Sequence, residues 1–371
     1  MRYLFSITLL LLAYSCSNDK EYPKDAIILT ENNIPPLLYI EAEKIELPDD
    51  LFLNSSFWVY KDTILLAINR DVPNPTFLTI MNLNNFEILG NYYAKGEGPG
   101  EVINIFGILD HNCLMVTDWA TDQKSVFNID SALQMRDNYK PIVFTSDANW
   151  VYFDWFSDST LLVQNRPYIE DAGKYNTNDV TREFFISDMV GKHDSVPVPE
   201  NVIFSTSTGG VARANEKLKK IFCAYLRWPK YKLLDYDMNV LKTICGPDDY
   251  LAVEYGPDAE GYNMVILNGY HAYNTVIQSN DEYIYVTCDR IIEIPESFFS
   301  SRMNLNQGID ELSIEHEELY QFDWDGNMVG RYKVKGNSIR TISLSEKDPK
   351  LIYFTGYNED RELCLFKTHL P

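Results

Sequence analysis

Pairs of polar, charged or aromatic residues recur at the ends of short apolar runs in this chain of 371 residues. Acids, guanidinium groups and aromatic rings gathered around one opening could bind a sugar, a peptide or a metabolite. Exposed loops are usually polar whatever their function, so a solvated rim is the alternative interpretation. The candidate ligand-binding pairs are Arg70 and Asp71, Asp118 and Trp119, Asn165 and Arg166, Arg227 and Trp228, Asp289 and Arg290, and Tyr357 and Asn358.

No standard catalytic or metal-binding spacing is visible. None of the five histidines stands in an HExxH motif or beside a GxSxG turn. The run at 315–318 (EHEE) is expected to be a solvated surface, because adjacent residues seldom converge on one ion. Residues 323–327 (DWDGN) resemble a calcium loop but lack its later Glu, and an Asp-Gly hairpin turn explains them. We therefore assign no catalytic residue, metal or cofactor.

Short β-rich runs punctuated by turns must position these residues. Six apolar runs, rich in β-branched or aromatic residues, are expected to be interior strands. Equivalent turns recur about every 45–60 residues, the length that a four-stranded propeller blade needs. We therefore expect an all-β fold, a six-bladed β-propeller of four-stranded antiparallel blades, over residues 36–371. The six runs lie at 62–71, 113–122, 159–167, 220–229, 282–290 and 350–360.

Closure of the ring requires a strand from the N-terminal part of the chain. The last blade, at 339–370, shows only three strands, and residues 37–47 (LLYIEAEKIEL) could supply the fourth. Closure would remove exposed strand edges that otherwise promote aggregation. Residues 295–316 would form an insertion in the fifth blade. A β-sandwich or two stacked β-domains is the structural alternative.

The N-terminus is typical of an export signal. Residues 1–15 contain Arg2 and then an apolar run of about 10 residues, too short for a membrane-spanning helix of roughly 20. Ala13 and Ser15 precede Cys16, which resembles a bacterial lipobox. The resemblance implies cleavage before Cys16 and lipidation of its thiol and amine, and so a membrane partner. The alternative is a plain signal peptide with an incidental Cys. Residues 16–35 are expected to be a flexible tether.

The composition limits the partners. The formal net charge of −22 repels phosphate backbones, so we expect no nucleic-acid partner. The other five cysteines show no metal-ligand spacing, and most lie in or beside apolar runs. We expect them to be buried, unpaired thiols inside strands, and one disulfide among them is the alternative. They are Cys113, Cys223, Cys245, Cys288 and Cys364.

A glycine-rich loop at 95–101 (KGEGPGE) lies between the first two expected blades. Its G-x-G-P-G-E pattern resembles the TolB-like six-bladed β-propeller lipoproteins of Bacteroides-type bacteria, although Val102 stands where that family often has an aromatic residue. The resemblance implies a secreted, lipid-anchored propeller with no settled activity. The residues that carry it are Gly96, Gly98, Pro99, Gly100 and Glu101.

These observations lead to two functional expectations. The first is an outer-membrane lipoprotein, facing the periplasm or the cell surface, that acts as a non-catalytic binding or scaffold protein for a polymer, a peptide or an envelope protein. The second is a hydrolase or lyase that acts on a carbohydrate or a lactone at the mouth of the propeller channel.

Overall fold

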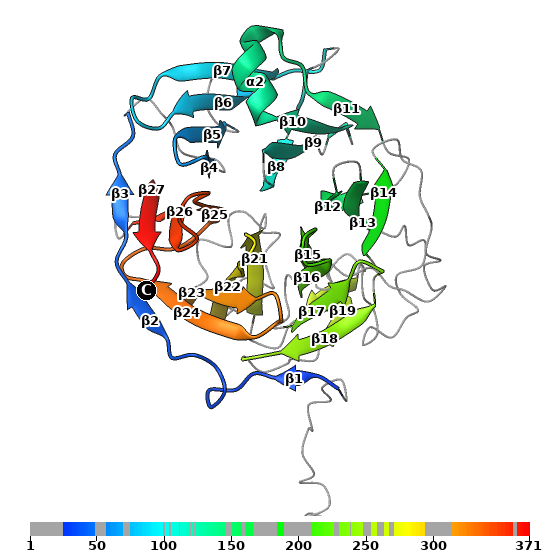
Figure 1. Ribbon diagram of the computed structural model, residues 1–371, viewed down its shortest axis with the longest axis vertical. Coiled ribbons are helices and arrows are strands. Elements are labelled where there is room, and N and C mark those ends of the chain that lie inside the picture. Colours follow the sequence, from blue (N-terminus) through cyan, green and yellow to red (C-terminus); the bar gives the residue numbers. More distant parts are fainter. Residues whose placement is uncertain are drawn as a thin grey trace, which may run out of the picture.

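The computed structural model arranges small sheets around a common centre, as in a β-propeller (Figure 1). Among the residues that it describes, no helix is long and apolar enough to cross a membrane. The described residues are 25–48, 57–69, 75–98, 101–103, 105–110, 112–118, 120–121, 123–145, 150–157, 160–165, 184–188, 210–225, 230–237, 239–247, 254–257, 263–266, 271–293, 313–358 and 362–371.

The blades follow one another along the chain, each as an antiparallel meander. The first two blades are β4 (Phe57–Tyr60), β5 (Ile64–Ile68), β6 (Thr76–Asn82) and β7 (Ile88–Ala94), and β8 (Ile105–Asp110), β9 (Cys113–Asp118), β10 (Gln123–Asn128) and β11 (Ile142–Thr145). The other three are β15 (Gly210–Asn215), β16 (Lys220–Tyr225), β17 (Lys230–Asp235) and β18 (Val240–Cys245); β21 (His271–Ser279), β22 (Tyr283–Glu293), β23 (Ser313–Asp323) and β24 (Met328–Val334); and β25 (Thr341–Leu344), β26 (Leu351–Tyr357) and β27 (Leu363–His369) with β3 (Glu43–Ile45).

The described residues thus form five blades with four antiparallel strands, whereas the sequence analysis expects six. A further sheet of three strands, β12 (Trp150–Ser157), β13 (Thr160–Asn165) and β14 (Phe184–Asp188), stands between β8–β11 and β15–β18 (Figure 1). Residues 189–209, which follow β14, lie outside the described residues. A separate two-stranded ribbon joins β19 (Glu254–Pro257) and β20 (Asn263–Ile266).

The second strand of each blade is buried on both faces, because neighbouring blades pack against each face. Residues 65–68 of β5 are all 0% exposed. Trp58 of the β4–β7 blade joins Leu114 and Phe127 of the next blade in one apolar cluster. Apolar runs without alternation are typical of strands buried in this way. The sequence prediction of interior strands is therefore confirmed where the burial is described.

The five cysteines of the described residues form no disulfide bonds, and all five are buried. This agrees with the expectation that they lie inside strands without disulfide partners. Burial raises the pKa of the Cys223 thiol far above its usual value, so little reactive thiolate forms there. The sulfur atoms therefore act as apolar packing groups.

Residues 25–48, here called the N-terminal strap, run along the outer edges of three consecutive blades (Figure 1). The strap contains β1 (Ile27–Ile28), which pairs in parallel with β18, and β2 (Leu38–Ile40), which pairs in parallel with β24. β3 pairs antiparallel with β27 and completes the last blade. The expected closing segment at 37–47 is thus divided, because only its second half closes the last blade. β1 falls inside the segment that was expected to be a flexible tether.

Ion pairs fasten the strap to the blades. Arg331 of β24 donates to Glu31 of the strap at 3.2 Å and also to Glu318 of β23. Glu318 is only 4% exposed, so the expectation of a solvated surface at 315–318 is wrong at this residue. A buried carboxylate needs such a charged partner. Lys335 and Glu41 form a more exposed pair at 2.6 Å.

Gly246 allows the strap to approach β18 closely. Its φ of +105° lies in a region that L side chains rarely adopt. A Cβ there would also collide with the backbone carbonyl oxygen of Leu29. The amide of Leu29 donates to the Cys245 carbonyl at 2.7 Å, which holds the two segments together.

We predict that Gly246→Ala loosens the strap and lowers the free energy of unfolding by about 1–3 kcal/mol, because the new methyl group meets backbone and the φ becomes strained. Chemical denaturation measures the loss, and limited proteolysis should cut first near residues 25–30. Val240→Ala, at an exposed position of β18, is the control and should change stability by less than about 0.5 kcal/mol. Equal stability of Gly246→Ala and the wild type would contradict the close approach.

Candidate functional site

Antiparallel blades present two different sets of turns at the two ends of the propeller. Turns between the first and second strands lie at one end, and loops between the second and third strands lie at the other, because the chain reverses at each turn. The candidate ligand residues of the sequence analysis stand at the ends of the apolar runs. These runs are the second strands of the blades, so the candidates belong to the second of these ends. In the structure, the described cavity lies among the first set of turns.

Six of the twelve candidate residues have a described backbone. Asn165 ends β13, while Asp289 and Arg290 lie inside β22, paired with β21 and β23, and not in a loop as expected. Three have described side chains: Asp118, Tyr357 and Asn358. The other six lie outside the described residues: Arg70, Asp71, Trp119, Arg166, Arg227 and Trp228.

Asp118 organises its own loop. It is 1% exposed, and its carboxylate accepts hydrogen bonds from the backbone amides of Ile103 and Ala120, each at 3.0 Å. The Thr121 hydroxyl adds a third at 2.9 Å. These bonds hold the carboxylate in place, and a ligand-binding role of Asp118 stays a prediction.

Tyr357 and Asn358 stabilise the loop after β26. The Asn358 side chain accepts from the Glu362 amide at 2.8 Å and donates to the Glu362 carboxylate at 3.0 Å. The Arg340 guanidinium lies 4.6 Å from the centre of the Tyr357 ring. These contacts occur within one blade and do not bring different blades together.

The glycine-rich loop folds back on itself. The Glu101 carboxylate accepts a hydrogen bond from the Gly98 amide at 2.8 Å. A Cβ at Gly96, where φ is +154°, would collide with that carboxylate. The loop glycines thus allow Glu101 to close a compact turn. Pro99 and Gly100 lie outside the described residues.

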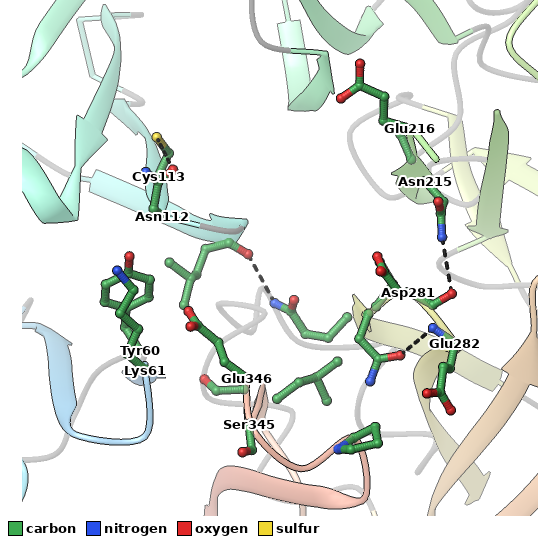
Figure 2. A pocket seen from close by; sticks show the side chains of 18 of the residues that line it. Tyr60, Lys61, Asn112, Cys113, Asn215, Glu216, Asp281, Glu282, Ser345 and Glu346 are labelled. Carbon is green, nitrogen blue, oxygen red and sulfur yellow. Dashed lines mark hydrogen bonds between the residues drawn. The ribbon is translucent and has the colours of Figure 1, made fainter. Parts of the chain in front are cut away.

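A central cavity of about 1260 Å³ lies among the described residues (Figure 2). The turns β4–β5, β8–β9, β15–β16, β21–β22 and β25–β26 line it, together with helix α2 (Ile129–Met135). Its walls carry carboxylate, amide and hydroxyl groups from five blades. The sequence analysis missed this cavity, because polar turn residues occur at both ends of every blade.

Gln278 of β21 reaches across the cavity toward the opposite side of the ring. Its amide donates to the Leu109 carbonyl of β8 at 3.4 Å, which links two blades that are not neighbours. β21 and β8 are each the end strand of their sheet that faces the centre of the ring, so this link crosses the centre (Figure 1).

Three side chains on one wall of the cavity interact through an ion pair and a hydrogen bond. The Lys61 ammonium lies 2.8 Å from an Asp130 carboxylate oxygen, and the Tyr60 hydroxyl donates to the same carboxylate at 2.9 Å. Asp130 is in the first turn of α2, whose N-cap is Asn128. Burial alone would raise the pKa of Asp130, but hydrogen bonds from Lys61 and Tyr60 outweigh it and hold that pKa below its usual value. Burial also raises the pKa of Tyr60 to about 12.

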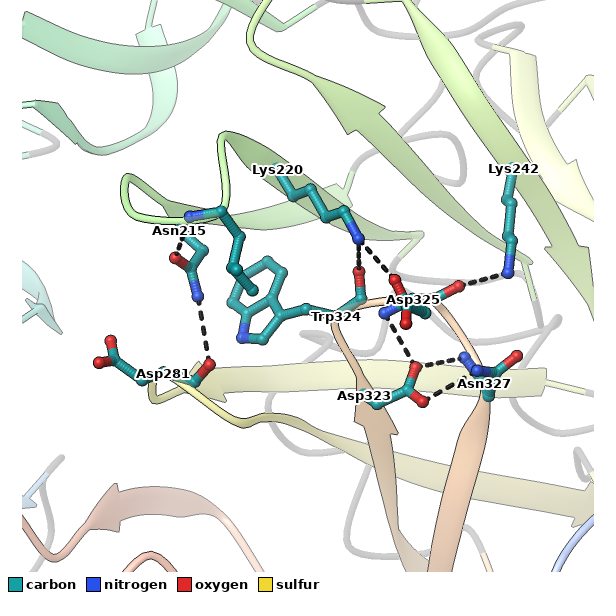
Figure 3. Close-up of polar contacts among 9 residues, drawn as sticks. Asn215, Lys220, Lys242, Asp281, Asp323, Trp324, Asp325 and Asn327 are labelled. Carbon is teal, nitrogen blue, oxygen red and sulfur yellow. Dashed lines mark hydrogen bonds and ion pairs between the residues drawn. The ribbon is translucent and has the colours of Figure 1, made fainter.

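The turn at 323–327 is an interblade contact. The Asp323 carboxylate accepts from the backbone amides of Asp325 and Asn327 and from the Asn327 side chain, at 2.8–2.9 Å (Figure 3). The Asp325 carboxylate pairs with Lys220 of β16 at 2.6 Å. Trp324 is 4% exposed and donates to the Asn280 carbonyl at 2.8 Å. These contacts favour the hairpin interpretation of this segment over a calcium loop.

The fold and the cavity define a β-propeller with a polar central site. No family model matches the chain, and no curated protein matches it in sequence. Crystal structures of a DUF4221 family member from Bacteroides vulgatus and of a candidate exported protein from Bacteroides fragilis are each similar at a TM-score of 0.52 and 11% identity. The alignments cover 91% of this chain and 98% of the first protein, and 93% of this chain and 99% of the second. At this identity the likeness shows the fold alone.

We predict that Asp130→Asn lowers the free energy of unfolding at neutral pH by about 0.5–1 kcal/mol. The effect is small because solvent screens the charges of this partly exposed ion pair. Because the pKa of Asp130 is lowered on folding, its contribution is present above the usual value of 3.8 and is lost as the pH falls below it. Denaturation at neutral and acid pH should show the difference disappearing in acid. Asp25→Asn, at an exposed residue, is the control. A stability difference between Asp130→Asn and the wild type that does not change with pH would contradict a stabilising Lys61–Asp130 pair.

Proposed function

We propose that this protein is an exported, lipid-anchored binding protein that holds its ligand in the central cavity. The observation that carries the proposal is the cavity of about 1260 Å³, to which five blades contribute polar groups. Carboxylates, amides and hydroxyls from different blades suit recognition by hydrogen bonds. We assign the protein a non-catalytic role toward a polymer, a peptide or an envelope protein.

We also propose that the chain belongs with the TolB-like six-bladed propeller lipoproteins. The G-x-G-P-G-E loop supports this assignment. The three-stranded sheet β12–β14 also supports it, because it follows the blade order around the ring.

The proposed location is the outer membrane, with the propeller facing the periplasm or the cell surface. Ala13, Ser15 and Cys16 support a lipid anchor, because they match the order of a lipobox after an apolar run of export length. Cys16 lies outside the described residues. The described chain begins at Asp25, next to β1 on the outside of the ring, so a tether of about nine residues would join the strap to the lipid.

We predict that Cys16→Ser abolishes the incorporation of labelled palmitate and releases the protein from the membrane fraction, because the acylated thiol is removed. The measurement is metabolic labelling followed by fractionation of the producing cells. Cys113→Ser is the control, since Cys113 is buried and should not carry lipid. Undiminished palmitate labelling of Cys16→Ser would contradict lipid attachment at Cys16.

We predict that Ser279→Trp, which places an indole on the cavity wall, abolishes binding to any ligand that the wild type retains on peptide and glycan arrays. Asn84→Trp, in the exposed β6–β7 turn outside the cavity, is the matched control and should bind normally. Circular dichroism confirms folding of both variants. Equal binding by Ser279→Trp and the wild type would contradict a cavity site, and turnover of an arrayed glycan or of a lactone would contradict the non-catalytic role.

A further inference from the structure

We infer that the ligand of the central cavity is a basic peptide segment, in which lysine or arginine side chains face one wall of the cavity. This inference rests on the proposed function, because it names the ligand class of the same site. It depends on the placement of charge around the cavity, on the size of the cavity and on its hydrogen-bonding groups.

Carboxylates outnumber ammonium groups in the described lining. It contains the acids Asp130, Glu216, Asp281, Glu282 and Glu346, and two lysines, Lys61 and Lys217. Both ammonium groups already lie against lining carboxylates. Lys61 is 2.8 Å from Asp130, and Lys217 is 3.5 Å from Asp281. Three lining carboxylates therefore have no lining lysine to balance them.

These three residues, Glu216, Glu282 and Glu346, are here called the acidic arc. They belong to the turns β15–β16, β21–β22 and β25–β26 of three consecutive blades. Glu216 lies 4.0 Å from Lys219, a contact between two exposed side chains that contributes little. All three side chains are exposed, so an incoming cation can reach them without displacing buried groups.

The opposite wall differs in charge. Figure 2 shows Glu216, Asp281 and Glu282 on one side of the cavity, Tyr60, Lys61, Asn112 and Cys113 on the other, and Glu346 between the two groups. On that second side the Lys61–Asp130 pair leaves no net charge. Two of the three unbalanced carboxylates, Glu216 and Glu282, therefore lie together on one side of the cavity, which would orient a ligand with charge on one face.

The size of the cavity favours a peptide segment over a small cation. Small-molecule sites usually measure about 300–1,000 Å³, and this cavity holds about 1260 Å³. An extended peptide advances about 3.3 Å per residue, so several residues fit across such a space. Amide groups of Asn112 and Gln278 and the hydroxyl of Ser279 are among the lining groups that can bond to a peptide backbone.

Other ligand classes fit the wall less well. An anionic ligand would be repelled by the acidic arc, and the formal net charge of −22 adds to that repulsion at longer range. No group of three or more metal-ligating side chains converges in the described part of the chain, so a bound metal ion does not explain the acids. A neutral sugar would leave the three carboxylates without an opposite charge.

The test uses the mature protein in uncharged detergent and four probes: a peptide of alternating Lys and Gly, its Glu and Ser counterparts, and a neutral oligosaccharide. Isothermal titration calorimetry should detect binding of the Lys peptide alone. Binding should weaken several-fold as salt is raised, because exposed charges are screened. The triple variant Glu216→Gln, Glu282→Gln, Glu346→Gln should bind about tenfold more weakly, since each exposed charge pair contributes about twofold to fourfold.

The matched control is Glu46→Gln, Glu87→Gln, Glu97→Gln, which removes three exposed carboxylates outside the cavity. It should change binding by less than about twofold. If the two triple variants weaken binding equally, net charge and not the acidic arc attracts the peptide, and the inference is overturned.

Ser279→Trp separates failure of this inference from failure of the proposed function. If the neutral or acidic probe binds the wild type and Ser279→Trp abolishes that binding, the cavity is a ligand site but the basic class is wrong. If the Lys peptide binds Ser279→Trp as well as the wild type, the cavity is not the site and both proposals fall. Absence of binding by all four probes overturns the basic class.

Discussion

Closure of the ring by the N-terminal strap is the constraint on which the rest of the structure depends. The Thr368 hydroxyl donates to the Glu41 carbonyl, 327 residues away in sequence, and β3 lies beside β27. Without this pairing, β27 would be an open edge. The turns that line the central cavity come from both sides of that junction, since β4–β5 follows the strap and β25–β26 precedes the C-terminus. The cavity therefore exists only when the ring is closed.

Much of the fold follows from the sequence because burial on both faces leaves a visible pattern. The apolar run at 62–71 predicts a buried strand, and β5 is one. The need for a closing strand follows from the missing fourth strand of the last blade. The division of residues 37–47 between two blades could not be predicted, because three residues pair as readily in parallel with β24 as antiparallel with β27. That choice depends on tertiary contacts such as Lys335 with Glu41.

The candidate site was harder to predict, because a polar residue after a strand has several uses. Asp118 ends β9 and Glu101 lies in the glycine-rich loop, and the carboxylates of both accept hydrogen bonds from nearby backbone amides. Glu216 and Glu346 occupy equally ordinary turns, yet they reach the cavity because their turns lie at its end of the ring. Sequence gives the residue type at each turn, but only the packing of the blades shows which end is hollow.

The strap also sets the order in which this molecule can be completed. A polypeptide is synthesised from its N-terminus, so β3 is made first among the strands of the last blade and β27 last. Contacts of such long sequence separation form slowly, because a large loop must close before they do. β3 therefore stays unpaired until β27 has been synthesised.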